Sequence, residues 1–378
     1  MTLYIFNPEH DYALANNEPH FVPPASAVKF AHDCAPFLRH IVPEDGFIYL
    51  PYADAEPFLS LQDQKLATLP EPVTRLQPWG WDPLVMRQCT ELLGNNGFAD
   101  EAKLSNIRAL AHRRKTIEAF HFLQHALPDM ALPEPALELF STDEMQQYVA
   151  DHRDVIFKSP YSGNGRGHLY AHGECSPTLL RQGSGVIRRQ GSILAEPLYD
   201  VVQDFAMEFK CDNGQVVFSG YSLFSTRHYG YAGNLLMKDD KIEKMLTQWV
   251  SPNDLHLLQN TLTQYIEQHI APVYDGYLGV DMFIYQQNYQ YRLNPMVEMN
   301  LRMTMGMAAH ILCERYVHPD SQGTMQLEFS PIAGKLQEHA SQQPPLKLKE
   351  GRWHSGFLSL SPIEKETQYA ITVNINPL

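Results

Sequence analysis

Apolar and polar positions alternate along several short stretches of the chain, and these stretches predict β-strands. Near the N-terminus, the apolar runs Leu3–Phe6 and Gly46–Leu50 are bounded by turn residues and separated by helical stretches, which favours an α/β domain. Residues 204–222 alternate on both sides of an Asn-Gly pair, which predicts a hairpin. The run Tyr369–Ile375 alternates as well, and we expect it to be a strand that docks onto an existing sheet.

Apolar residues at helical spacing predict helices between these strands. Residues 105–127 carry such a pattern, and the Pro-rich segment Leu132–Pro135 ends it. Ser141 or Thr142 is expected to cap a further helix with acids in its first turn. Residues 251–271 read as an amphipathic helix with a proline at its first position, and the polar stretch 334–345 as a connector.

Oxygen-bearing side chains lie on two consecutive predicted strands in the last third of the chain. Asp281 lies in the run Leu278–Tyr285, and Glu298 and Asn300 follow on the next strand. Residues i and i+2 of a strand share a face, and Mg²⁺ takes hard oxygen ligands, so the three are candidate magnesium ligands. Ordinary sheet polarity is the alternative. Asp281 and Glu298 are 17 positions apart, long for a simple hairpin, and Asn294-Pro295 is expected to absorb the excess as a bulge or bend.

A lysine and a glycine-rich loop come more than a hundred residues earlier. The apolar run Val155–Lys158 is followed by Gly163, Gly165 and Gly167. Glycines let backbone amides surround an anion, and Lys158 adds a positive charge for phosphate oxygens. The loop matches neither a Walker A sequence nor the dinucleotide fingerprint, and a hairpin turn is the alternative interpretation.

The order of these parts along the chain resembles the ATP-grasp superfamily of ATP-dependent ligases. A lysine with a glycine loop comes first, an apolar strand ending in an acid over residues 191–198 comes next, and the Asp and Glu-x-Asn residues follow. The resemblance covers roughly residues 105–310. It implies an α/β (α+β) ATP-grasp fold in which an N-terminal α/β domain precedes two nucleotide-clasping subdomains. The expected domains are 1–104, 105–190, 191–335 and a C-terminal connector and strand over 336–378.

The resemblance also implies roles for individual residues at the nucleotide. Lys158 and the three glycines would contact the phosphates, and the segment holding Glu196 and Leu198 would read adenine. Asp204 would hold the ribose, with Glu208 as the alternative. A further basic residue before the Pro-rich segment is assigned to Lys115, with Arg114 fitting nearly as well.

For the metals and substrates, the resemblance implies two Mg²⁺ ions on Asp281, Glu298 and Asn300. Arg302 would then face the reacting phosphate or substrate. The Gly-, Tyr- and Arg-rich stretch 225–234 is expected to be a flexible flap with Arg227 as its anion contact, or otherwise a solvent loop with aromatic anchors.

Three N-terminal loops are candidates for contacting a second substrate. Residues 7–11 and 51–54 follow predicted strands, and residues 79–82 form a compact polar-aromatic loop. The alternative is that their Asn and Asp residues cap turns and that their Trp residues fill an interface.

Composition narrows the choice of function. The chain has 378 residues, of which 44% are hydrophobic and 19% charged, as in a soluble globular protein of two or three domains. A net charge of −14 argues against unassisted binding to nucleic acid or an anionic membrane. No signal peptide or membrane span is evident, and five scattered cysteines favour reduced thiols in the cytoplasm. His121 and His125 are one helical turn apart but lack the glutamate of a zinc motif, so we expect a surface pair.

Together these features predict an ATP- and Mg²⁺-dependent ligase. It would activate a small-molecule or peptide carboxylate as an acyl phosphate, which an amine or another nucleophile then attacks. A phosphotransferase on the same fold and a non-catalytic nucleotide-binding module are the alternatives. The sequence does not identify the substrates.

Overall fold

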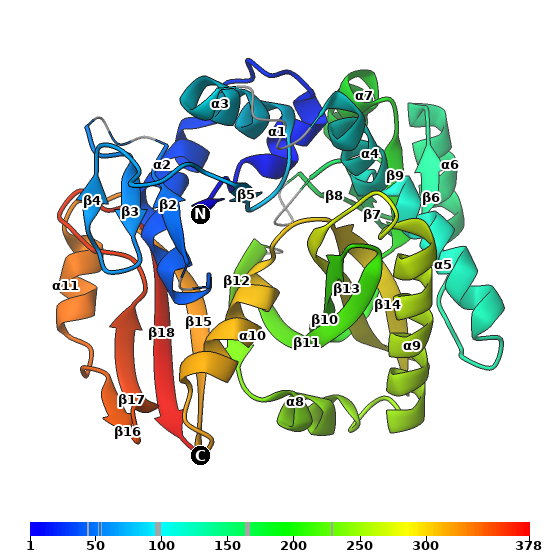
Figure 1. Ribbon diagram of the computed structural model, residues 1–378. Coiled ribbons are helices and arrows are strands. Elements are labelled where there is room, and N and C mark those ends of the chain that lie inside the picture. Colours follow the sequence, from blue (N-terminus) through cyan, green and yellow to red (C-terminus); the bar gives the residue numbers. More distant parts are fainter. Residues whose placement is uncertain (44, 52, 54, 95–99, 163–166, 228–229) are drawn as a thin grey trace. The chain divides into compact units, whose positions relative to one another are not determined.

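The computed structural model describes residues 1–43, 45–51, 53, 55–94, 100–162, 167–227 and 230–378 (Figure 1). The chain forms two compact units. Unit 1 comprises Met1–Leu104, Ala232–Ile242 and Arg302–Leu378, and unit 2 comprises Ser105–Tyr231 and Glu243–Leu301. In the described part of the chain, no helix is long and apolar enough to span a membrane.

Unit 1 begins with a sheet of strand order β4-β3-β2-β1-β5. Its centre is parallel and its β3–β4 edge antiparallel, so the predicted N-terminal α/β arrangement is confirmed. The strands are β1 (Thr2–Ile5), β2 (Gly46–Tyr49), β3 (Phe58–Ser60), β4 (Lys65–Leu66) and β5 (Arg75–Pro78). The helices of this part are α1 (His10–Asn16), α2 (Ala25–Cys34), η1 (Ala35–His40) and α3 (Pro83–Leu93).

The rest of unit 1 is built around a second set of strands. The predicted C-terminal strand is confirmed, because it pairs with antiparallel neighbours on both sides. The strands are β12 (Gly230–Leu236), β15 (Ser321–Phe329), β18 (Tyr369–Pro377), β17 (Arg352–Ser359) and β16 (Lys347–Lys349), and the helices are α10 (Met305–Tyr316) and α11 (Lys335–Ser341). The expected connector at 334–345 therefore contains a helix. Phe6, Phe37 and Trp79 stack edge to face or tilted in the shared core.

Unit 2 contains a small sheet of order β6-β9-β7-β8. The strands are β6 (Leu137–Leu139), β7 (Asp154–Lys158), β8 (Leu169–His172) and β9 (Ile193–Pro197), and the helices are α6 (Thr142–His152) and α7 (Pro177–Gln190). Ser141, one of the two predicted cap residues, is the N-cap of α6 and forms a capping box with Glu144. The apolar faces of the helices and strands bury a common core that includes Met145 and Phe157.

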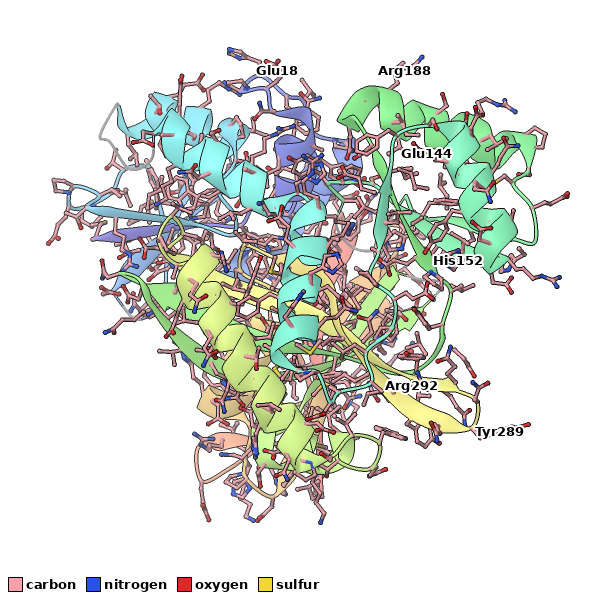
Figure 2. All side chains as sticks on the ribbon, turned by 90° about the vertical axis from the view of Figure 1, so that its right-hand side faces the viewer. Glu18, Glu144, His152, Arg188, Tyr289 and Arg292 are labelled. Carbon is pink, nitrogen blue, oxygen red and sulfur yellow. The ribbon has the colours of Figure 1, made fainter. Side chains whose placement is uncertain are left out.

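The larger part of unit 2 is an antiparallel run of strands in the order β14-β13-β10-β11. Its strands are β10 (Asp200–Asp212), β11 (Gln215–Arg227), β13 (Gly276–Gln287) and β14 (Gln290–Asn300). Asn213 and Gly214 have positive φ, so the predicted Asn-Gly hairpin turn is confirmed. The tip of the β13–β14 hairpin carries Tyr289, which projects into solvent (Figure 2).

Three helices accompany these strands, α4 (Glu101–Ala111), α5 (Arg114–Ala126) and α9 (Pro252–His269), and a short helix, α8 (Asp239–Leu246), precedes α9. The predicted helical stretch 105–127 is thus two helices with a break before Arg114. Ser251 caps α9, and Pro252 occupies its first turn as expected. Phe122 of α5 packs against Tyr265 of α9, with ring centroids 5.3 Å apart.

The stretch 225–234 does not form the expected loop. Residues up to Arg227 complete β11 and residues from Gly230 begin β12, while 228–229 lie outside the described residues. The local sequence is rich in Gly and Tyr, but residues 233–236 pair with β15 in antiparallel register. Strand pairing therefore prevails over the turn propensity of the glycines.

Candidate nucleotide and metal site

Lys158 is held by a carboxylate from the neighbouring strand. It ends β7 with 5% of its surface exposed, and its Nζ donates to both Oε atoms of Glu196 on β9, each at 2.8 Å. Ile156 is the register partner of Glu196, so the lysine reaches diagonally across the strand pair. The structure thus brings together a predicted phosphate contact and a predicted adenine contact. Leu198, at the end of the same segment, donates its backbone N–H to the Asp154 carbonyl at 2.8 Å.

Asp204 lies on β10 and is half-buried. Burial raises its pKa, while a 3.4 Å hydrogen bond from Thr226 Oγ1 and the charge of Lys158 act in the opposite direction. Glu208, the alternative ribose contact, lies on the same strand but is 1% exposed. Asp204 is therefore the more accessible of the two carboxylates.

The three predicted magnesium ligands lie together on β13 and β14. Asp281 and Glu298 are direct register partners, and Asn300 Nδ2 donates to Asp281 Oδ2 at 3.1 Å. Partners on antiparallel strands share a face, and so do residues i and i+2, so all three side chains belong to one face. Asp204 belongs to the same face, because its strand pairs Ala206 with Asp281.

The long spacing between Asp281 and Glu298 is accommodated by a bulge. Phe283 pairs with Asn294, so Met282 alone stands opposite the three residues 295–297. The predicted irregularity at Asn294-Pro295 is therefore confirmed. Because the bulge takes up the additional residues, Glu298 is the register partner of Asp281.

The donor set of these residues fits Mg²⁺. Two carboxylates and one amide side chain offer oxygen ligands, which is the chemistry that Mg²⁺ prefers over nitrogen or sulfur. Within the described ranges no three His, Cys, Asp or Glu side chains cluster as a metal site, so any such site depends on the amide of Asn300.

Arg113 is a site residue that the sequence reasoning missed. It is 3% exposed, and its Nη2 forms an ion pair with Glu298 Oε1 at 2.6 Å. The same guanidinium donates to the Ser159 carbonyl at 3.2 Å, to Ser162 Oγ at 3.2 Å and to the Ser162 carbonyl at 3.0 Å. One side chain thus joins the start of the glycine loop to the strand that carries Glu298.

The two bases that follow Arg113 point elsewhere. Lys115 Nζ forms an ion pair with Glu118 one turn along α5 at 2.6 Å, and Arg114 Nη2 pairs with Glu138 at 2.8 Å. Consecutive helical positions are rotated by about 100°, so only one of three adjacent bases can face the sheet. The signal for Arg113 was the break between α4 and α5, which the hydrophobic pattern did not reveal.

The glycine loop is partly described. Gly163 and Gly165 lie outside the described residues, and Gly167 has a φ of +87°. The next residue, His168, has its pKa lowered to about 3 by burial and by the charges of Lys158 and Arg113. The charges of Lys158 and Arg113 therefore act on the exit of the loop.

The two predicted arginine contacts, Arg227 and Arg302, belong to different parts of the chain. The side chain of Arg227 lies outside the described part of the chain. Arg302 belongs to unit 1, where its Nε and Nη2 donate to the carboxylate of Asp11 at 3.3 and 3.2 Å.

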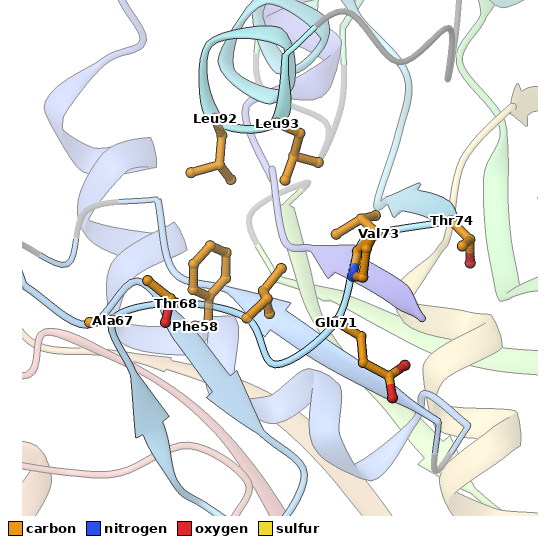
Figure 3. Close-up of a pocket in the computed structure, with 10 residues that line it drawn as sticks. Phe58, Ala67, Thr68, Glu71, Val73, Thr74, Leu92 and Leu93 are labelled. Atoms are coloured by element: carbon orange, nitrogen blue, oxygen red, sulfur yellow. The ribbon is translucent and has the colours of Figure 1, made fainter.

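Two of the three candidate N-terminal loops meet in unit 1. Residues 7–11 and 79–82 follow the parallel strands β1 and β5 and are joined by buried hydrogen bonds, whereas 52 and 54 in the third loop lie outside the described residues. A separate hollow of about 790 Å³ in unit 1 is lined mostly by apolar side chains such as Phe58, Val73 and Leu92, with Glu71 at its side (Figure 3). None of the predicted site residues lines this hollow.

Comparison with known proteins establishes the fold. No family model and no curated protein matches the sequence. Among solved structures, the chain is similar to N5-carboxyaminoimidazole synthetase from Staphylococcus aureus complexed with ADP, with a TM-score of 0.50, 13% identity, and coverage of 100% of this chain and 93% of that one. It is also similar to a biotin carboxylase β,γ-ATP complex from Campylobacter jejuni, with a TM-score of 0.50, 13% identity, and coverage of 80% and 71%.

The chain has the ATP-grasp fold. The fold class inferred from the order of the motifs is therefore confirmed. Sequence identity this low indicates a shared architecture and carries no information about the substrate.

Proposed function

We propose that the protein is an ATP- and Mg²⁺-dependent ligase that activates a substrate carboxylate as an acyl phosphate for attack by an amine. One observation carries the proposal. Asp281, Glu298, Asn300 and Asp204 share one face of the unit 2 strands, and Arg113 joins Glu298 to Ser159 and Ser162, which follow Lys158 in the chain. One buried side chain thus connects the oxygen ligands for a metal to the segment that carries the lysine for phosphate.

Different residues of unit 2 are proposed to contact the adenine, the ribose and the phosphates of the nucleotide. Glu196 and Leu198 flank adenine, and Asp204 holds the ribose. Lys158 and the loop of Gly163, Gly165 and Gly167 contact the phosphates. Lys158 is already desolvated and held in place, so little reorganisation is needed when a phosphate arrives.

Asp281, Glu298 and Asn300 would hold the metal. Bound Mg²⁺ would neutralise charge on the phosphates during transfer. The guanidinium of Arg113 holds Glu298 in place through an ion pair and offsets the charge of that carboxylate. Because Arg113 is buried and bonded to the start of the loop, whereas Lys115 is paired with Glu118, we propose Arg113 in place of Lys115 as the further basic residue of the nucleotide site.

Arg302 of unit 1 is proposed to face the reacting phosphate or substrate, and Arg227 is proposed separately as an anion contact. Asp11 fixes the guanidinium plane of Arg302 with two hydrogen bonds, which suits directed contact with an anion. Arg227 completes β11 next to Thr226, the hydrogen-bond partner of Asp204.

The test combines ADP release with hydroxylamine trapping. Purified protein is incubated with ATP, Mg²⁺, hydroxylamine and pools of carboxylates, and hydroxamate is measured alongside ADP. Formation of both with one pool supports the ligase, because hydroxylamine converts acyl phosphates to hydroxamates. A phosphorylated product without hydroxamate indicates a phosphotransferase. ATP binding without ADP release in any pool indicates a binding module.

Two variants link any activity to the site. Glu298→Gln keeps the shape of the side chain but removes its charge, and we expect a loss on the order of a hundredfold or more in ADP release. Glu267→Gln, the same change at an exposed position of α9, is expected to keep full activity. Equal activity of both variants would overturn the assignment of Glu298.

A further inference from the structure

His168 of unit 2 carries a buried polar atom to which the proposed nucleotide site gives no partner. The residue follows Gly167 and directly precedes β8. Its Nε2 is shielded from solvent and has no hydrogen-bond partner in the part of the chain that the structure describes, and the Nε of Arg113 is in the same state. Unpartnered buried polar atoms cost free energy and are rare in folded proteins. Two of them in residues that interact electrostatically point to a ligand that pairs with them.

The register of the small sheet explains why this histidine lies near Lys158. Phe157 pairs with Leu169 in the β7–β8 ladder. If the ladder is continued by one residue, His168 lies opposite Lys158. Phe157 belongs to the core shared with α6 and α7, and adjacent residues of a strand point to opposite faces. Lys158 and its partner Glu196 therefore belong to the face away from these two helices, and His168 extends that polar face.

Burial and two cations keep the His168 ring neutral. Together with burial, the charges of Lys158 and Arg113 lower the pKa of His168 from 6.5 to about 3. Each cation has a carboxylate partner, Glu196 for Lys158 and Glu298 for Arg113. Neither carboxylate is among the groups that shift this pKa. The charges that act on the ring therefore come from β7 and from the segment before α5, and both are positive.

A phosphate group would change the charge state of this ring. Phosphate oxygens accept hydrogen bonds, and their negative charge opposes the effect of the two cations on the imidazole. A nearby anion favours the protonated ring, which carries a hydrogen on both nitrogens. Protonated His168 can then donate from Nε2 to a phosphate oxygen, in a charge-assisted bond that is stronger than a bond from the neutral ring.

We propose that His168 is a further basic contact of the nucleotide phosphates, beside Lys158, and that it binds them in its protonated form. This inference rests on the proposed function, because it assigns a residue to the phosphate end of that nucleotide site. The ring takes up one proton from solvent when ATP binds and returns it when the phosphates leave. The site thus gains a further positive charge only while the phosphates are bound.

ATP affinity then depends on pH in a defined direction. Binding is accompanied by the uptake of a proton, so affinity rises as the pH falls. If bound phosphate returns the pKa of His168 to the ordinary histidine value of about 6.5, this residue strengthens ATP binding about tenfold at about pH 5.5 and hardly at all at about pH 7.5.

Calorimetric titration with Mg²⁺-ATP tests this linkage. Wild type and His168→Gln are titrated between about pH 5.5 and 7.5, each in two buffers that differ in ionisation enthalpy, which gives the number of protons taken up per ATP. At about pH 5.5 we expect the wild type to take up about one proton more than His168→Gln and to bind ATP about tenfold more tightly. At about pH 7.5 the difference should nearly vanish. Protonation of ATP itself is common to both proteins and cancels in the comparison.

Controls distinguish a phosphate contact from a structural role. His172→Gln changes a largely exposed histidine of the same strand and should match the wild type at every pH. His168→Asn serves as a second variant, and thermal unfolding shows whether each variant is folded. Equal proton uptake by the wild type and the His168 variants would overturn the inference, as would a loss of affinity of the same size at every pH. Absence of ATP binding by the wild type would instead reject the proposed nucleotide site itself.

Discussion

A buried pair of a carboxylate and a basic side chain can be compared between the two units, because the two pairs differ in what the base can do. In unit 2, Lys158 is held by Glu196 between two strands of a sheet. In unit 1, His10 is held by Asp82 between two loops. A lysine that donates to a carboxylate provides a fixed positive charge, whereas an imidazole can take up and release a proton. The pair in unit 2 therefore offers a fixed charge, which the proposed function assigns to phosphate, whereas the pair in unit 1 holds a titratable ring.

The largest expected effect concerns the fixed pair. Lys158→Met leaves Glu196 buried without its cation, and we expect a loss of about 3–5 kcal/mol in the free energy of unfolding, because an uncompensated buried charge remains. Urea denaturation followed by circular dichroism measures it. The double variant Lys158→Met/Glu196→Gln should recover most of the loss. A single variant as stable as the wild type would show that the pair is not buried as described.

Arg113→Lys is expected to have the next largest effect. Lysine cannot reproduce the fork that reaches Glu298, Ser159 and Ser162 together, so about 1.5–3 kcal/mol of unfolding free energy should be lost. Arg114→Lys is the matched control, because its pair with Glu138 is exposed on the arginine side and should contribute under about 1 kcal/mol. Equal losses in the two variants would contradict the distinction between these arginines.

Gly80→Ala tests the packing of the His10–Asp82 pair. The new Cβ would meet the His10 ring at 2.5 Å, and we expect about 1–3 kcal/mol of destabilisation from overpacking. Gly185→Ala in α7 is the control, since it meets only the flexible end of Arg189 at 3.3 Å and should be neutral or stabilising. Thermal unfolding measures the stability of both variants. A Gly80→Ala variant as stable as the wild type would show that the His10 ring is free to move.

The last expected effect is a dependence of stability on pH. The pKa of His168 is lowered from 6.5 to about 3, so the unfolded chain binds more protons between these values. The contribution of neutral His168 is therefore fully present above pH 6.5 and is lost progressively as the pH falls below it. His168→Asn should flatten the decline in unfolding free energy over this range, and His172→Asn at an exposed position should not. An unchanged decline in His168→Asn would contradict the buried, neutral imidazole.

The sequence predicted those parts of the molecule that depend on local pattern. The hairpin at Asn213-Gly214, the cap at Ser141 and the bulge before Glu298 follow from turn chemistry, capping and the geometry of proline. The order of the motifs was enough to indicate the fold. The hairpin turn, the helix cap and the bulge can be predicted from sequence because the residues that determine each of them lie close together in the chain.

Long-range contacts were not predictable in the same way. The choice of Arg113 over its two basic neighbours depends on a helix break and on a strand nearly 200 positions later. The pairing of His10 with Asp82 requires β1 and β5 to be neighbours in the sheet, which no local pattern specifies. The expected loop at 225–234 is strand on either side of 228–229, because pairing with neighbouring strands outweighs local propensity.

The most direct test of the account is calorimetric titration of ATP with and without Mg²⁺, for the wild type and Glu298→Gln. The account predicts that Mg²⁺ strengthens ATP binding to the wild type and that Glu298→Gln loses most of this gain while binding metal-free ATP as before. The same Mg²⁺ dependence in both proteins would contradict the placement of the metal on Asp281, Glu298 and Asn300.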